Sequence, residues 1–87
     1  MAKIIIPFPL RKYADNRREV IIDGDDLKET MELLLRQYPG LETINHDSSL
    51  LSIFINNRLI RTGIEKWNTL ILNNEDEIAL IIPIAGG

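Results

Sequence analysis

The sequence predicts a single α+β domain, in which a mixed sheet of four to five strands carries one main helix across one face. Three observations predict this fold. Segments rich in β-branched residues stand near both ends of the chain and in its second half, one amphipathic helical pattern lies between them, and 87 residues leave room for one domain only. The hydrophobic content of 45% is enough for one compact core.

The first two predicted strands form a β-hairpin. Residues 3–10 open with three isoleucines, which favour a strand, and consecutive apolar residues predict burial on both faces of the sheet. Pro7 and Pro9 remove backbone donors, so the second half of this segment should lie at the margin of the sheet or leave it. Residues 13–18 are polar and predict a turn, and residues 19–23 form the second strand.

One helix follows the hairpin. Asp26 is a favourable N-cap, and Glu29 stands three residues later, as a capping box requires. Pro39 and Gly40 end the helix. Apolar residues recur at helical spacing along one face, at Leu27, Met31, Leu34, Leu35 and Tyr38. The helix should therefore lie with this stripe against the sheet.

The second half of the chain returns to strands. Residues 41–49 are irregular, and residues 50–56 form a third strand. Asn56 and Asn57 should reverse the chain into a short return strand at residues 58–61, because asparagine tolerates positive φ. Residues 62–69 predict a loop in which Trp67 covers the end of the core.

A final strand closes the sheet. Residues 73–76 predict a turn, and residues 77–83 are an apolar strand. The order strand, strand, helix, strand, short strand, strand is that of a β-grasp domain, whose first and last strands lie adjacent and parallel at the centre of the sheet. We expect a domain over residues 1–83 and a flexible tail at residues 84–87.

The tail ends in Gly86 and Gly87. By chance a chain would end in two glycines about once in two hundred cases, so the pair alone is a weak signal. Here it follows directly on a predicted central strand. Residues without Cβ atoms can thread a narrow channel in a partner enzyme and present one reactive group, the terminal carboxylate. A carboxylate must be activated before it reacts, and this chain lacks a phosphate-binding glycine loop of its own.

Four segments resemble the MoaD/ThiS family of ubiquitin-like sulfur carriers. Residues 73–87 resemble the family's closing strand and tail, in which an acidic turn leads to an apolar strand, a proline and a final Gly-Gly. Residues 53–61 resemble its paired strands about an asparagine turn. Residues 9–12 resemble the exit of the first strand, and residues 24–27 the start of the helix. The length of the chain and the strand exit at residues 9–11 favour the MoaD-like branch of this family.

The resemblance implies a carrier that is a substrate of enzymes and is not itself an enzyme. An E1-like adenylyltransferase would use ATP to adenylylate the carboxylate of Gly87. A persulfide or sulfide donor would then displace AMP and leave a thiocarboxylate, which gives its sulfur to a synthase subunit. No cofactor is bound by the carrier itself. By the same resemblance, the tail residues are Ala85 and Gly86, and the partner-binding face contains Arg11, Leu59, Ile81 and Pro83.

Other chemistries find little support. The absence of cysteine excludes disulfides, thiolate zinc sites and cysteine nucleophiles. A net charge of −3 argues against nucleic acid, and no apolar run is long enough to span a membrane, so a cytoplasmic protein is expected. His46 lacks convergent metal or catalytic partners, and Asp23, Asp25 and Asp26 lack the remaining ligands of a calcium loop. We therefore expect neither a metal site nor a catalytic residue.

Three functions remain open at this point. The sulfur carrier could serve molybdenum cofactor (molybdopterin), cysteine, thiazole or secondary-metabolite biosynthesis. A ubiquitin-like protein modifier would use the same activated tail to form isopeptide bonds. A β-grasp interaction module would carry its terminal glycines incidentally.

Overall fold

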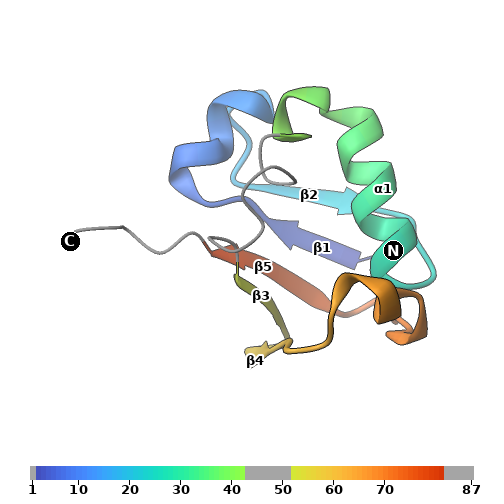
Figure 1. Cartoon of the computed structure of the whole chain (residues 1–87). Helices are drawn as coiled ribbons and strands as arrows, with labels where there is room; N and C mark the ends of the chain where they lie inside the picture. Colours follow the sequence, from blue (N-terminus) through green and yellow to red (C-terminus); the bar gives the residue numbers. More distant parts are fainter. Residues whose placement is uncertain (1, 43–51, 82–87) are drawn as a thin grey trace.

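The computed structural model describes residues 2–42 and 52–81 (Figure 1). Its order of elements is β1 (Ala2–Ile5), the 3-10 helix η1 (Phe8–Tyr13), β2 (Glu19–Ile22), α1 (Leu27–Gln37), the 3-10 helix η2 (Pro39–Glu42), β3 (Ser52–Ile55), β4 (Arg58–Leu59), the 3-10 helix η4 (Ile64–Thr69) and β5 (Glu77–Ile81). Within these residues, no helix is both long and apolar enough to cross a membrane.

The five strands form one mixed sheet in the order β2-β1-β5-β3-β4, which Figure 1 shows from top to bottom. β1 and β5 are parallel at the centre, with Ile4 opposite Ile78. β2 pairs antiparallel with β1, and β3 pairs antiparallel with both β5 and β4. The predicted hairpin, helix and parallel central strands are confirmed, and the fold is a β-grasp.

The start of α1 confirms the predicted cap. The Asp26 carboxylate accepts a hydrogen bond from the Glu29 backbone N–H at 2.7 Å. The Glu29 carboxylate in turn accepts from the backbone N–H of Asp25 at 2.7 Å, one residue before the N-cap. Two backbone donors at the helix start are thereby satisfied, as in a capping box.

The core lies between α1 and one face of the sheet. Four residues of the predicted helical stripe are buried, and the fifth, Leu35, packs partly buried against them. The half-buried Trp67 ring also packs on the core, and its Nε1–H donates to the carbonyl of Thr62 at 3.0 Å, so its predicted covering position is confirmed. The core side chains that are fully buried are Ile4, Ile6, Leu27, Leu34, Leu41, Ile78 and Leu80, together with Thr30.

The structure contains both predicted turns, at Asn56–Asn57 and at residues 73–76, and in the second the Asp76 N–H donates to the Asn73 carbonyl at 3.1 Å. Asn56 and Asn57 both have positive φ, at 51° and 69°, and join β3 to β4. The Asn56 side chain also reaches β5: its Nδ2 donates to Asp76 Oδ1 at 2.8 Å, and its Oδ1 accepts from Glu77 N at 3.0 Å. Hydrogen bonds from the Asn73 backbone and the Asn56 side chain hold the pKa of Asp76 below its ordinary value.

The structure corrects the boundaries of several elements. The sequence predicts a loop at residues 62–69, but the 3-10 helix η4 occupies most of them. A 3-10 helix of six residues is too short to show a helical period in the sequence. β1 ends before the two prolines, and η1 begins at Phe8 within the segment predicted as a strand or its margin. Residues 43–51 and 82–87, with His46 and the predicted tail, lie outside the described residues.

The prediction that the first strand is buried on both faces is wrong. Ile4 and Ile6 are fully buried, whereas Ile5 between them is only partly buried. In β5, Ile78 and Leu80 are buried but Ile81 is 45% exposed. The continuous apolar runs therefore reflect a second apolar surface on the sheet, opposite the helix.

Candidate functional site

A row of apolar residues crosses the face of the sheet that α1 does not cover. Ile5 on β1 lies opposite Ala79 on β5, Ala79 lies opposite Phe54 on β3, and Phe54 lies opposite Leu59 on β4. Residues that oppose each other in a ladder share a face of the sheet. We call this surface, with Ile81, the open face.

Several side chains of the open face are accessible. Leu59 is 43% exposed and Ile81 is 45% exposed, although both are large aliphatic residues on strands. Ile81 lies opposite Ser52, two positions along from the row through Phe54, so it extends the surface toward the end of β5. An apolar surface of this kind on a small protein is typical of a protein-binding site.

The open face adjoins the point where β5 ends. Because β1 and β5 are parallel, with Ile5 opposite Ala79, their carboxyl ends lie at the same edge of the sheet. The segment that leaves β1 there is η1, and Figure 1 shows it beside the tips of both arrows. η1 therefore lies at the edge of the sheet where β1 and β5 both end.

Arg11 is held in place at this edge. Its Nε–H donates to the carbonyl of Ile6 at 3.0 Å, and its guanidinium lies 5.7 Å from the centre of the Phe8 ring. Pro7 and Pro9 flank Phe8 and fix their own φ angles, so the ring stands on a stiff segment. Phe8 is 79% exposed and borders, with Arg11, a shallow hollow of about 580 Å³.

The structure brings together part of the predicted partner face. Leu59 and Ile81 lie on the open face, on β4 and β5. Arg11 lies on η1, at the margin where β1 and β5 end. The other predicted site residues lie outside the described part of the chain, namely Pro83, Ala85, Gly86 and Gly87.

Sequence reasoning missed two aromatic residues. Phe54 lies in the middle of the open face. Its position between Ile53 and Ile55, which point to the core side of β3, could have predicted this, because side chains alternate along a strand. The sequence places Phe8 at a strand margin, although a phenylalanine between two prolines has no strand neighbour to pack on. Both rings add apolar area near the predicted partner residues.

In the two described segments, no group of three His, Cys, Asp or Glu side chains could hold a metal ion. The carboxylate of Asp76 has a lowered pKa, and its hydrogen bonds to Asn73 and Asn56 give it a structural role at a turn. What the described surface offers is binding area.

Known structures share this fold over almost the full length of the chain. The structure is similar to that of the Amycolatopsis orientalis BexX/CysO complex, with a TM-score of 0.83, 17% identity and 100% of both chains covered. It is similar to small archaeal modifier protein 1 from Methanosarcina acetivorans, with a TM-score of 0.76, 27% identity and 99% and 95% covered.

The complex of subunits 1 and 2 of the molybdopterin-converting factor from Helicobacter pylori contains a further similar chain, with a TM-score of 0.64, 24% identity and 99% and 97% covered. No curated protein shows significant similarity. In sequence, the ThiS family matches residues 4–87, which is almost the whole chain and includes both final glycines. This protein therefore belongs to the ThiS/MoaD family of β-grasp sulfur carriers, which are substrates of partner enzymes and not catalysts.

Proposed function

We propose that this carrier holds its sulfur on the carboxyl carbon of Gly87, at the end of a tail formed by residues 84–87 on a domain of residues 1–83. The observation that carries the proposal is the family match, which runs through residue 87 and so includes the Gly-Gly end. The position of β5 supports it, because a central strand paired on both sides is a rigid base for a tail.

Two chemical steps load the sulfur. A carboxylate oxygen of Gly87 attacks the α-phosphorus of ATP on an E1-like enzyme, forming an acyl adenylate and releasing pyrophosphate. Sulfide then attacks the carboxyl carbon and expels AMP, which leaves a thiocarboxylate. A persulfide donor would first give an acyl disulfide, and a second thiol would cleave it. The carrier supplies only the carboxylate, so the ATP site belongs to the partner.

The partner-binding face is the open face together with Arg11, and it continues to Pro83, the last residue of the proposed domain. Leu59 and Ile81 are exposed on the same face, and the row through Phe54 joins them. Arg11 stands at the edge where β5 ends, so a partner that covers the open face and takes in the tail would meet its guanidinium. A surface with an apolar centre and a charged margin is the usual anatomy of a protein interface.

The loaded sulfur serves a biosynthetic synthase. Structures similar to this one include a BexX/CysO complex and a molybdopterin-converting factor. We accordingly place the acceptor among the enzymes of cysteine, molybdopterin, thiazole or secondary-metabolite synthesis. Intact-mass measurement with each candidate acceptor would identify the pathway by the loss of sulfur from the carrier.

Loading is tested by intact mass. The carrier is incubated with an E1-like enzyme of its own genome, ATP and sulfide, and the expected gain is that of one oxygen replaced by one sulfur. Deleting Gly87 should abolish this gain while leaving the folded domain unchanged by circular dichroism. Loading of the truncated chain, or no mass gain on the intact chain, would contradict the proposal.

The open face is tested with a matched pair of substitutions. Leu59→Asp places a charge in the proposed interface and should slow loading about tenfold or more, because burying an unpaired carboxylate against an apolar partner is costly. Ile64→Asp makes the same kind of change on η4, where Ile64 is 55% exposed, and loading should stay within about twofold. Equal effects of the two substitutions would show that the open face has no special role.

Protein modification is a second candidate function. The specific support for it is the similarity to small archaeal modifier protein 1, at 27% identity over 99% of this chain. An activated Gly87 could be attacked by a lysine amine in place of sulfide, giving an isopeptide bond and AMP. Lysine-linked conjugates in cells, lost when Gly87 is deleted, would favour this function over sulfur transfer.

A further inference from the structure

A second surface lies at the opposite margin of the sheet, on strand β2. This strand is an edge of the sheet, with β1 on one side only. The backbone N–H of Ile6 donates to the carbonyl of Arg18, which continues the ladder one step beyond the pair of Ile5 and Glu19. In an antiparallel ladder, hydrogen-bonded and non-hydrogen-bonded pairs alternate. The pairs of Ile5 with Glu19 and of Lys3 with Ile21 are therefore non-hydrogen-bonded.

This alternation leaves backbone groups of β2 directed away from the sheet. The N–H of Lys3 donates to the carbonyl of Asp76, on the β5 side, as expected if the pair of Lys3 and Ile21 is not hydrogen-bonded. The N–H and C=O groups of Glu19 and Ile21 must point outward, and among the described residues no hydrogen bond to them is found. Edge strands are commonly protected by Lys, Pro or a covering loop. The middle of this edge is Ile21, which is 52% exposed.

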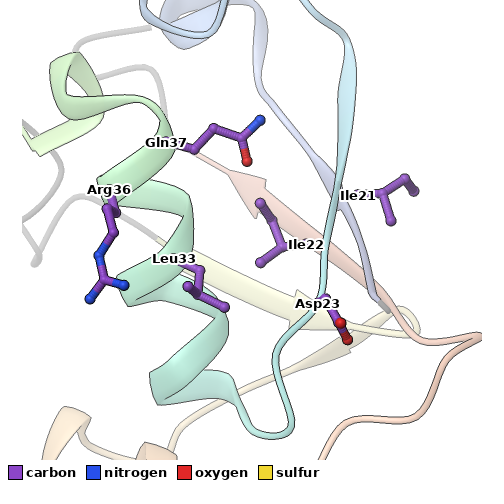
Figure 2. Close-up of a pocket in the computed structure, with 6 residues that line it drawn as sticks. All are labelled: Ile21, Ile22, Asp23, Leu33, Arg36 and Gln37. Carbon is purple, nitrogen blue, oxygen red and sulfur yellow. The ribbon is translucent and has the colours of Figure 1, made fainter.

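A hollow lies beside this edge, between β2 and α1. Its volume is about 530 Å³, and it is lined by Ile21, Ile22, Asp23, Leu33, Arg36 and Gln37. Figure 2 shows Ile22 and Leu33 directed into the space between strand and helix, with Ile21 on the other side of the strand. The floor of the hollow is therefore aliphatic, and one of its walls is the free backbone edge.

The charges around the hollow are unequal. Arg36 and Gln37 lie at the end of α1, and Asp23 lies at the opposite end of the hollow (Figure 2). An ion pair joins Lys3 to Glu19, whereas within the described residues no ion pair of Arg36 is found. Arg36 is thus the one cationic residue among those that line the hollow, and its exposed side chain runs along the side of α1 away from Ile22 in Figure 2.

We propose that the β2–α1 groove binds an extended peptide segment of a partner protein, which adds to β2 as a sixth strand and carries acidic residues at its Arg36 end. Outward N–H and C=O groups on an edge strand are satisfied by another strand, the mode of recognition called β-augmentation. The peptide residue that pairs with Ile21 points toward the open face, and its two neighbours point into the hollow. Those neighbours are aliphatic, to match Ile22 and Leu33.

This site is separate from the sulfur chemistry. β2 and β5 are divided by β1, and β5 ends at the edge of the sheet near η1. A partner on β2 could therefore hold the carrier while its tail is in use, or select which enzyme complex it joins. The groove does not depend on Gly87, so its test succeeds or fails independently of sulfur loading.

The probe is a capped short peptide in which valines alternate with threonines and two aspartates follow. A second peptide has the reversed sequence, because the edge accepts either strand direction, and a third has lysines in place of the aspartates. Amide NMR spectra of the full-length ¹⁵N-labelled protein report binding. One of the two acidic peptides should shift the amides of Glu19 and Ile21 and those of Leu33 to Gln37, while the amides of β4 stay in place.

Three substitutions define the site. Arg36→Glu should weaken binding of the acidic peptide about tenfold and strengthen binding of the lysine peptide, because the charges are exchanged. Arg58→Glu is the matched control, with the same charge change on the opposite edge strand β4, and should leave affinity within about twofold. Ile21→Pro removes an outward N–H and no bond to β1, so binding should be lost while the amides of β5 keep their positions.

If Ile21→Pro fails to fold, the proposal is still decided by Arg36→Glu, which should bind the lysine peptide more tightly and the acidic peptide less tightly than the natural chain does. The proposal is overturned if neither acidic peptide moves the amides of β2 at saturating concentration, or if the shifts map to the open face. It is also overturned if the free protein is a dimer by light scattering with the Ile21 amide protected from exchange, because a second copy would then occupy the edge.

Discussion

The two faces of the sheet contain similar residues but differ in what those residues do. On the face against α1, Ile4, Ile78 and Leu80 are at most 2% exposed and form the core. On the open face, Ile81 and Leu59 are 45% and 43% exposed, although hydropathy alone would not separate them from core residues. Neighbouring positions on one strand, such as Leu80 and Ile81, therefore experience different environments.

The difference indicates which face is kept for stability and which for binding. Burying a large aliphatic side chain contributes about 1.5–3 kcal/mol, and the covered face gains this on folding. The open face gains much less, since its side chains stay partly in water. A small domain that retains aliphatic residues there keeps an apolar surface that a partner can cover.

The largest expected effect compares one isoleucine from each face of β5. Ile78→Ala leaves a cavity at a fully buried site and should lower the free energy of unfolding by about 2–5 kcal/mol. Ile81→Ala should change it by less than about 0.5 kcal/mol. Urea unfolding followed by circular dichroism measures both values.

The same two variants separate stability from binding. If the division between faces is correct, Ile81→Ala slows loading by the E1-like enzyme although its stability is unchanged. A loss of stability for Ile81→Ala comparable with that of Ile78→Ala would mean that the open face is also part of the folded core, and the comparison would fail.

A smaller effect is expected at the Asn56–Asp76 pair, which joins the β3–β4 turn to the start of β5. Asp76→Ala removes the hydrogen bonds to Asn56 and Asn73 and should cost about 0.5–1.5 kcal/mol at neutral pH. The pKa of Asp76 is lowered from 3.8, mainly by the Asn73 backbone bond and then by the Asn56 side chain. The carboxylate therefore adds stability that is fully present above pH 3.8 and is lost as the pH falls through the lower, folded-state pKa.

The pH dependence provides the check. The stability difference between the natural chain and Asp76→Ala should be constant from pH 7 to about 5 and should shrink below pH 3.8. Glu75 is an exposed acidic neighbour in the same turn, so Glu75→Ala is the matched control for the loss of one carboxylate and should cost less than about 0.5 kcal/mol at neutral pH. A difference for Asp76→Ala that persists unchanged at low pH would show that the neutral acid supports the turn equally well.

Local signals predicted most of the fold. The cap at Asp26, the apolar stripe of α1 and the paired asparagines each act within a few residues, so they are visible in sequence and are confirmed. The β-grasp order followed from strand and helix order, since first and last strands with apolar runs fit the centre of a sheet. These features need no knowledge of distant contacts.

Tertiary features were harder to predict. The exposure of Ile81 and the alignment of Phe54 with Leu59 depend on register across paired strands, which no single segment contains. The short helices η1 and η4 lack a period long enough to recognise. The free edge of β2 depends on its place in the sheet, which no local pattern encodes. The role of Gly87 in the tail stays a prediction.

The smallest expected effect concerns a polar side chain buried beneath the covered face. The Thr30 hydroxyl on α1 is fully buried, and within the described residues it has no hydrogen-bond partner. Thr30→Val replaces it with a methyl group of similar shape and removes the cost of an unsatisfied hydroxyl, so stability should rise by about 0.5 kcal/mol. Binding at the open face should be unchanged, because Thr30 lies on the other side of the sheet. Loss of stability in urea unfolding would instead show that the hydroxyl is satisfied in solution, for example by a buried water.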